Sequence, residues 1–195
     1  MVRTIGTDAE LIKRIVGELA LRLPHEGRRV VIVAERDSLY AQSLVSELKY
    51  RLPDSRAKDQ PIRIEVIYFF RGIDGVTTRE SGAPTSGPPS KTVTLEWPES
   101  RDQLDYLRRL GAELKRSESD PTRLPIGAIG IFANDVHDKL LVLQALHEDF
   151  SDRMFFTTDM DARYLHPRTQ AFTRNLVVAS SLPLAFYPPV SYTHL

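Results

Sequence analysis

The sequence predicts an α/β fold in which helices cover both faces of a mainly parallel sheet. Three observations support this fold class. Apolar, strand-like runs alternate with amphipathic, helix-like segments; three such runs end at acidic residues, in 30–37, 126–135 and 154–159; and no internal repeat breaks the order. Strands that alternate with helices form parallel sheets, which bind ligands beyond the carboxyl ends of their strands. We therefore expect the three acidic turns to share one edge.

The first helix and the first strand are predicted by a cap and by a β-branched run. Thr7 and Glu10 have the spacing of a capping box, and apolar residues then recur every four positions until Pro24, which predicts a helix over about 7–23. The run 30–34 (Val-Val-Ile-Val-Ala) is short and rich in β-branched side chains. Such runs are typical of strands that are buried on both faces of a sheet.

A second helix and a second strand precede a long polar insertion. Asp37 or Ser38 caps a helix whose apolar stripe covers 40–52, and residues 62–70 form the next strand. Residues 72–91 are rich in Gly, Pro, Ser and Thr, with almost nothing apolar to bury, so we expect a flexible insertion. This insertion is either a solvated loop or a lid that closes over a ligand.

The second half of the chain continues the alternation. Its expected elements are an edge strand at 92–95, a helix at 99–115, a strand at 126–133, a helix at 138–147 and strands at 154–158 and 176–179. Leucines three or four positions apart predict the helices. Gly127 and Gly130 lie inside a strand, where close packing of a helix on the sheet explains them better than a phosphate loop. We expect a single lobe over 1–187 and a doubtful tail over 188–195.

Charge and composition exclude several classes of function. The 26 basic and 26 acidic residues cancel, so bulk charge attracts neither nucleic acid nor an anionic membrane. The chain has no cysteine, which excludes disulfides and thiolate chemistry but indicates no compartment. Charges along 1–18 exclude a signal-peptide core and a membrane span, so we expect no direct membrane insertion of this segment. The histidines lack metal-ligand spacing, and no cofactor motif occurs.

One segment resembles the start of the second lobe in type 1 periplasmic-binding-protein-like domains. In 27–41 (Gly-Arg-Arg-Val-Val-Ile-Val-Ala-Glu-Arg-Asp-Ser-Leu-Tyr-Ala) a strand ends in acidic and small residues, and a tyrosine follows near the helix start. Later segments that follow the family's order of strands, ligand-facing turns and helices are 126–135, 140–146, 155–159 and 175–181. The resemblance covers roughly 4–183 and implies a three-layer, Rossmann-like lobe.

The resemblance implies binding rather than catalysis. Members of this family hold small ligands, often amino acids or sugars, between two lobes that close on a hinge. We expect this chain to hold only one lobe, and the insertion 72–91 departs from the family's pattern. The ending 189–195 resembles a recurrent spurious ending of truncated, translated reads, so we expect this chain to be a fragment of a larger polypeptide. The resemblance suggests a periplasmic or extracellular location, which the residues themselves do not indicate.

Six residues near the strand ends are candidates for ligand binding, namely Asp37, Ser38, Tyr40, Asn134, Asp135 and Asp159. The first three offer an acceptor, a hydroxyl and an aromatic wall at a helix N-terminus, and Asn134 and Asp135 offer hydrogen bonds after the third strand. The family often places an acidic residue at the position of Asp159 to hold a ligand's ammonium group. A carboxylate in a dry crevice needs such a partner. Helix capping is the alternative role for Asp37, Asn134 and Asp135.

We therefore predict noncatalytic recognition of a small, amino-acid-like polar ligand. One alternative is a structural or regulatory interaction module of a larger signalling or membrane protein. Another is a magnesium-dependent phosphatase, because Asp159 and Asp161 after an apolar strand resemble the nucleophile motif of haloacid-dehalogenase-like phosphatases. Little sequence follows that motif for the family's later lysine and metal ligands. Ser180 and Ser181 lack the glycines of a nucleophile elbow, so hydrolase chemistry has no support.

Overall fold

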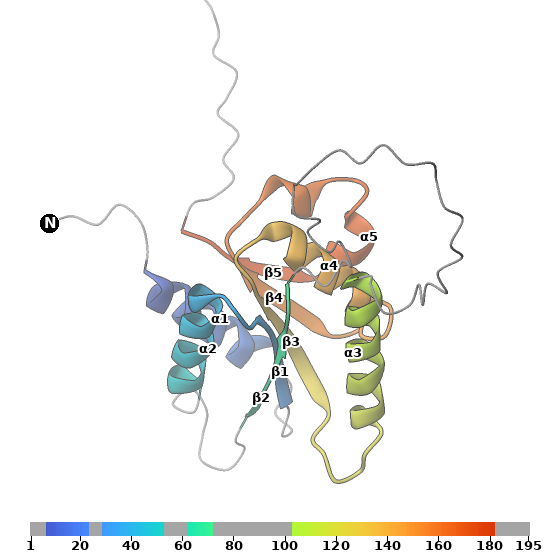
Figure 1. Cartoon of the computed structure of the whole chain (residues 1–195). Coiled ribbons are helices and arrows are strands. Elements are labelled where there is room, and N and C mark those ends of the chain that lie inside the picture. The colour runs from blue at the N-terminus through green and yellow to red at the C-terminus, as the bar shows by residue number, and fades with distance from the viewer. Residues whose placement is uncertain (1–6, 24–28, 53–61, 72–102, 182–195) are drawn as a thin grey trace, which may run out of the picture.

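A three-layer α/β/α arrangement is present, as the alternation of segments predicts (Figure 1). The computed structural model of the chain describes residues 7–23, 29–52, 62–71 and 103–181. The predicted insertion at 72–91, the edge strand at 92–95 and the tail at 188–195 lie outside the described residues.

The five strands form one parallel sheet in the order β2-β1-β3-β4-β5. The strands are β1 (Arg29–Glu35), β2 (Arg63–Phe69), β3 (Ile126–Phe132), β4 (Met154–Thr158) and β5 (Leu176–Ala179). The register aligns Glu35 with Phe69 and Thr158 with Ala179, so the carboxyl ends meet at one edge, at the top of Figure 1. Since β2 and β3 flank β1 on opposite sides, the topological switch point lies between β1 and β3.

Helices cover both faces of the sheet. They are α1 (Asp8–Arg22), α2 (Leu39–Arg51), α3 (Gln103–Glu118), α4 (Val136–His147), the short α5 (Gln170–Thr173) and the 3₁₀ helix η3 (Ala162–Leu165). Helices α1 and α2 pack on one face, and α3, α4 and α5 lie on the other (Figure 1). The alternation of side chains along β1 serves both layers, since Ile32 packs with α1 and α2 and Val33 with α3 and α4.

The helix starts follow from their caps. Thr7 accepts a hydrogen bond from the backbone N–H of Glu10, as the capping-box spacing predicts. Of the two residues proposed to cap α2, Ser38 does so. Asp135 caps α4, which therefore begins two positions before the predicted 138. The sequence pattern did not predict η3 and α5, because four-residue helices are too short to show a periodic apolar stripe.

Gly130 is packed by side chains of the neighbouring strands. A Cβ atom built on Gly130 would lie 2.4 Å from Cζ of Phe156 and 2.7 Å from Cδ1 of Ile32. The Phe156 ring is fully buried and packs edge to face on Phe132, with ring centroids 6.0 Å apart. The expected reason for a glycine, direct packing of a helix, is therefore wrong at this position, because the side chains of Phe156 on β4 and Ile32 on β1 fill the space first.

Candidate functional site

Charged side chains occupy the switch point at the carboxyl edge. Glu35, at the end of β1, is 5% exposed, and its Oε2 accepts a hydrogen bond of 2.8 Å from the backbone N–H of Asn134. Arg71, which follows β2, reaches across to Asp135 and Asp138, with an N···O distance of 3.0 Å to each. These contacts join the ends of β1, β2 and β3.

An open hollow lies further along the same edge, between the ends of β3 and β4. Its volume is about 270 Å³. It is lined by Asn134, Asp135, Val136, Lys139, Asp159, Met160, Asp161 and Arg163. Three of these were predicted from the sequence as ligand-binding candidates, and they come from two different strand ends.

Asp159 is the centre of the polar cluster beside this hollow. It has a φ of 62°, in the left-handed region, which aspartate adopts more readily than most residues. Its backbone N–H donates to the carbonyl of Ala179 at 2.9 Å, which fixes the turn after β4. Its Oδ2 accepts from the Tyr40 hydroxyl at 2.7 Å, the Thr158 hydroxyl at 3.1 Å and the Lys139 ammonium at 3.3 Å.

Lys139 is a buried cation in the first turns of α4. Its side chain is 2% exposed, and Nζ also donates to the backbone carbonyl of Thr158 at 3.0 Å. Burial lowers the pKa of Lys139, while the charge of Asp159 and its hydrogen bond act in the opposite direction. The ammonium partner that Asp159 was expected to find in a ligand is thus already supplied by the chain.

Tyr40 connects α2 to this cluster. Burial raises the pKa of Tyr40, and the hydrogen bond to Asp159 raises it further. The phenol is therefore protonated at neutral pH and acts as a donor to Asp159. Its hydroxyl also lies 3.2 Å from Oγ1 of Thr158.

Two further carboxylates border the hollow, and each accepts a hydrogen bond from a backbone N–H in the first turn of a helix. Asp135 accepts a hydrogen bond of 2.8 Å from the backbone N–H of His137; this bond, and to a smaller extent the charge of Arg71, lower the pKa of Asp135. Asp161 caps η3 and binds the Arg163 guanidinium at 3.0 Å. That side-chain hydrogen bond lowers the pKa of Asp161. Both carboxylates are therefore ionised at neutral pH.

The structure brings four of the six predicted residues together. Asn134, Asp135 and Asp159 line the hollow, and Tyr40 joins them through its bond to Asp159. The Oγ of Ser38 accepts from the backbone N–H of Ala41 at 3.1 Å, so this buried hydroxyl serves the cap of α2. Asp37 is exposed and is not among the residues that line the hollow.

Sequence reasoning missed the cations and Glu35. For Lys139 a signal existed, because a lysine one turn after a helix cap is disfavoured by the helix dipole and so calls for a specific partner. Glu35 directly follows the apolar run 30–34 and still belongs to the strand, which was a weaker signal. Arg71 follows β2 and Arg163 lies in the short helix η3, two segments whose sequences carry no periodic pattern, and only the fold brings them to this edge.

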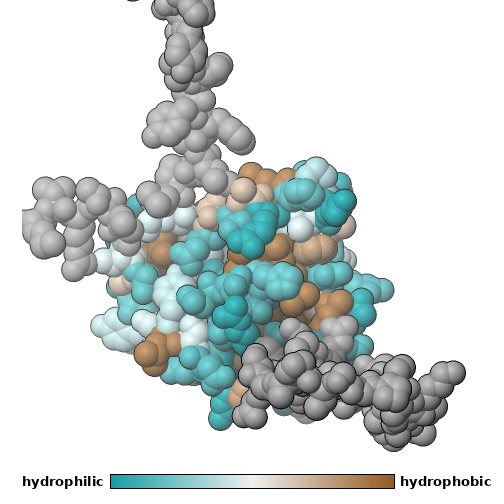
Figure 2. Space-filling model, turned by 45° about the horizontal axis from the view of Figure 1, so that its top comes forward, coloured by the Kyte–Doolittle hydropathy of each residue, from teal (hydrophilic) through white to brown (hydrophobic). Residues whose placement is uncertain are grey.

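Exposed apolar side chains lie at the same carboxyl edge of the sheet as the polar hollow. Leu39, Phe70 and Leu165 follow the ends of β1, β2 and β4 and are 83%, 42% and 52% exposed. With the carboxyl edge tilted toward the viewer, Figure 2 shows apolar patches interleaved with polar surface. Patches of this kind at the rim of a polar site are typical of surfaces that a partner covers.

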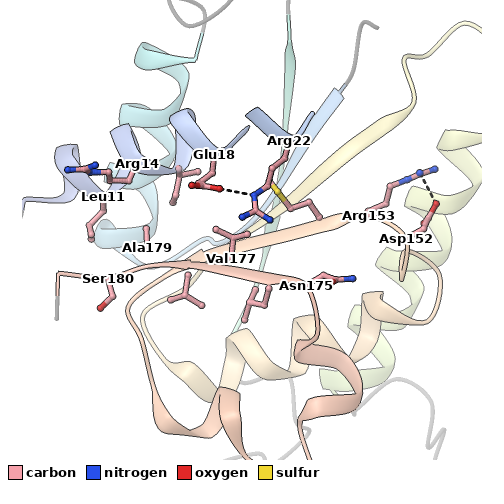
Figure 3. Close-up of a pocket in the computed structure, with 14 residues that line it drawn as sticks. Leu11, Arg14, Glu18, Arg22, Asp152, Arg153, Asn175, Val177, Ala179 and Ser180 are labelled. Atoms are coloured by element: carbon pink, nitrogen blue, oxygen red, sulfur yellow. Dashed lines mark hydrogen bonds and ion pairs between the residues drawn. The ribbon is translucent and has the colours of Figure 1, made fainter. Parts of the chain in front are cut away.

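A larger groove runs along the outer strand of the sheet. It has a volume of about 940 Å³ and lies between α1 and the edge of β5 (Figure 3). Arg14, Glu18 and Arg22 extend from α1, and Asn175 precedes β5. Glu18 pairs with Arg22 at 2.7 Å, so part of this charge is neutralised within the helix.

Two classes of feature are not found in the described part of the chain. Within those residues, no group of three or more His, Asp or Glu side chains is placed to hold a metal ion. None of the helices described there is long and apolar enough to cross a membrane.

Comparisons with known proteins support the fold. No protein-family model and no curated protein sequence match the chain. Among solved structures, it matches an extracellular ligand-binding receptor from Verminephrobacter eiseniae ef01-2 with a TM-score of 0.57 and 11% sequence identity. The match covers 93% of this chain but only 39% of the receptor chain. The chain therefore has the fold of one lobe of a periplasmic-binding-protein-like receptor.

Proposed function

We propose that the hollow between the ends of β3 and β4 binds a small, amino-acid-like polar ligand, as one wall of a two-lobed sensor or solute-binding domain that catalyses no reaction. The observation that carries this proposal is the convergence of Asn134, Asp135 and Asp159 on one hollow. In this proposal Asp159 holds the ligand's cationic group, and Asn134 and Asp135 supply hydrogen bonds. Tyr40 and Ser38 fix the start of α2 beside them.

The accessibility of Asp159 supports this role. Its side chain is 53% exposed although Oδ2 already has three donors, so a ligand ammonium can approach the exposed side of the carboxylate. The ligand would then share Asp159 with Lys139. Two cations on one carboxylate repel each other, and we therefore expect binding by this lobe alone to be weak.

The size of the hollow supports a second wall. Ligand pockets usually enclose about 300–1,000 Å³ and bury most of the ligand. A hollow of about 270 Å³ that is open to one side is small by this measure. The exposed Leu39, Phe70 and Leu165, which follow strand ends at the same edge of the sheet, offer apolar area for a facing lobe.

The proposal is tested by isothermal titration calorimetry of the full-length protein with a panel of free amino acids. We expect the double variant Asp135→Ala, Asp159→Ala to weaken binding of any hit by at least about tenfold, or about 1.4 kcal/mol. Asp152→Ala is the matched control, because this exposed carboxylate precedes β4 at the opposite edge of the sheet. Unchanged affinity in the double variant contradicts the proposed site.

The groove along β5 favours a second candidate function, an interaction module. Among the described residues, β5 pairs with β4 alone. A strand edge that is flanked by charged side chains is a common place for another polypeptide segment to add to a sheet. Amide hydrogen exchange distinguishes the two functions. Stronger protection of residues 176–179 in the full-length protein than in this chain, together with no binding in the amino-acid panel, would favour the interaction module.

A further inference from the structure

We propose that Lys139 captures a short 2-oxo acid as a reversible imine in the hollow between β3 and β4. The ligand class combines a carbonyl group for the lysine amine and a carboxylate for the guanidinium of Arg163, which lines the same hollow. The inference shares its location with the proposed function but does not depend on it, because it requires covalent capture rather than recognition of an ammonium group.

The position of Lys139 is unusual for a lysine that only stabilises the fold. Nζ has three hydrogens, and two acceptors are seen, the carbonyl of Thr158 at 3.0 Å and Oδ2 of Asp159 at 3.3 Å. The residue lines the hollow although its side chain is 2% exposed, so it belongs to the inner wall rather than to the rim. A desolvated lysine at a pocket wall is the common setting of imine-forming amines.

The neighbours of Lys139 supply the proton transfers that imine formation needs. Asp159 lies within reach to take a proton from the ammonium, and its exposed side can return that proton to the departing hydroxyl. Tyr40 donates to Oδ2 of Asp159 at 2.7 Å and stabilises the carboxylate form of Asp159 before the first of these steps and after the second. Burial also lowers the pKa of Lys139, which increases the fraction of neutral amine.

The reaction balances without a further reactant. The protonated amine first passes a proton to Asp159. The neutral amine nitrogen then adds to the carbonyl carbon as the C=O π bond breaks, and one N–H proton passes to the carbonyl oxygen, which gives a carbinolamine. The carbinolamine hydroxyl then takes the proton from Asp159 and leaves as water. The product is a protonated imine that keeps one N–H and one positive charge, so the ion pair with Asp159 is preserved.

Arg163 gives the proposal its preference for an acid. Its guanidinium is 59% exposed and is held by Asp161 through Nε at 3.0 Å and through a terminal nitrogen at 3.1 Å. This pairing orients the group and leaves its exposed side open to an incoming carboxylate. Of the basic side chains that line the hollow, Lys139 is buried and Arg163 is exposed. Lys139 therefore forms the imine in this proposal, and Arg163 binds the carboxylate.

The test is reductive trapping with glyoxylate and cyanoborohydride, followed by peptide mapping for carboxymethyl-lysine. Lys115 is the internal control, because its Nζ also donates to a backbone carbonyl at 3.0 Å and lies near a glutamate, but its side chain is 51% exposed. At neutral pH we expect Lys139 to be modified at least about tenfold faster than Lys115, because its amine is desolvated and lies at the wall of the hollow. We also expect the ratio of the modification rate of Lys139 to that of Lys115 to be smaller with acetaldehyde, which lacks the carboxylate.

Several outcomes would overturn the proposal. A purely structural lysine is shielded, so modification of Lys115 with little or none at Lys139 contradicts imine formation. Equal ratios for glyoxylate and acetaldehyde contradict the preference for an acid. The difference in modification rate between the two lysines must disappear when the protein is unfolded in urea. If it persists, the local sequence and not the fold explains it. Binding of amino acids in the calorimetric experiment above is a separate measurement, so failure of one idea leaves the other testable.

Discussion

Removing the charge of Asp159 is expected to destabilise the protein more than removing the charge of Lys139. Asparagine is the suitable replacement, because Asp159 has a positive φ that asparagine also tolerates. Asp159→Asn leaves the Lys139 ammonium buried without a negative partner. Lys139→Met removes the buried charge itself and leaves a carboxylate that is 53% exposed.

The expected magnitudes follow from burial. Removing one partner of a fully buried ion pair costs about 3–5 kcal/mol. Asp159 is half exposed, so water and the Asn side chain replace part of the lost interaction, and Lys139 keeps its bond to the carbonyl of Thr158. We therefore expect Asp159→Asn to lower the free energy of unfolding by about 1–2 kcal/mol. For Lys139→Met we expect less than about 1 kcal/mol, because methionine fills a similar path and buries no charge.

Urea unfolding followed by far-UV circular dichroism measures both free energies. The double variant sharpens the result, since Asp159→Asn should cost less than about 0.5 kcal/mol once Lys139 has been replaced by methionine. The reasoning is refuted if Lys139→Met is the more destabilising change, or if the two substitutions add independently.

Three further substitutions test separate parts of the structure. Tyr40→Phe removes the hydroxyl bond to the polar cluster and should cost about 1 kcal/mol in urea unfolding, whereas Tyr50→Phe, on the exposed face of the same helix, should change stability by less than about 0.3 kcal/mol. Gly130→Ala should lower thermal stability by about 1–2 kcal/mol, because a methyl group 2.4 Å from the Phe156 ring forces the ring to move and outweighs the gain in backbone entropy; an unchanged melting temperature would contradict this packing. The pKa of Asp135 is lowered by the hydrogen bond that it accepts from the backbone, so its contribution is present above the unfolded pKa of about 3.9 and is lost as pH falls through the lower folded pKa. Asp135→Asn should therefore destabilise by less than about 1 kcal/mol near pH 7 and be neutral near pH 2, and a difference that persists in acid would contradict this assignment.

The elements of the fold could be predicted because each strand is short, apolar and bounded by polar residues. The strands at 154–158 and 176–179 have the predicted bounds. The strands predicted at 30–34 and 62–70 differ from the observed ones by one residue at each end, and the strand predicted at 126–133 by one residue at its end. The shared edge was also predictable, because it follows from parallel pairing and not from any one residue. The fold was therefore accessible from local patterns.

The polar cluster could be predicted only in part. Strand-end position identified Asp159 and Asp135, but the partner of Asp159 could not be found in this way. Tyr40 lies 119 positions from Asp159, and the burial of Lys139 depends on how α4 packs beside β4. Which of two adjacent candidates caps α2 depends on the backbone angles at Ser38, and these are set by the turn after β1. Such pairings depend on tertiary contacts, which a single sequence does not display.

The arrangement around Asp159 has a mechanical consequence. Tyr40 belongs to the helix layer on one face of the sheet and Lys139 to the layer on the other, and both hold the same carboxylate oxygen. The sheet separates the two hydrophobic cores, but at this edge one atom, Oδ2 of Asp159, is bonded to a residue from each helix layer. A ligand that draws Asp159 away from either partner loosens both layers at once. A displacement of Asp159 at the hollow would in this way reach the helix layers on both faces of the sheet.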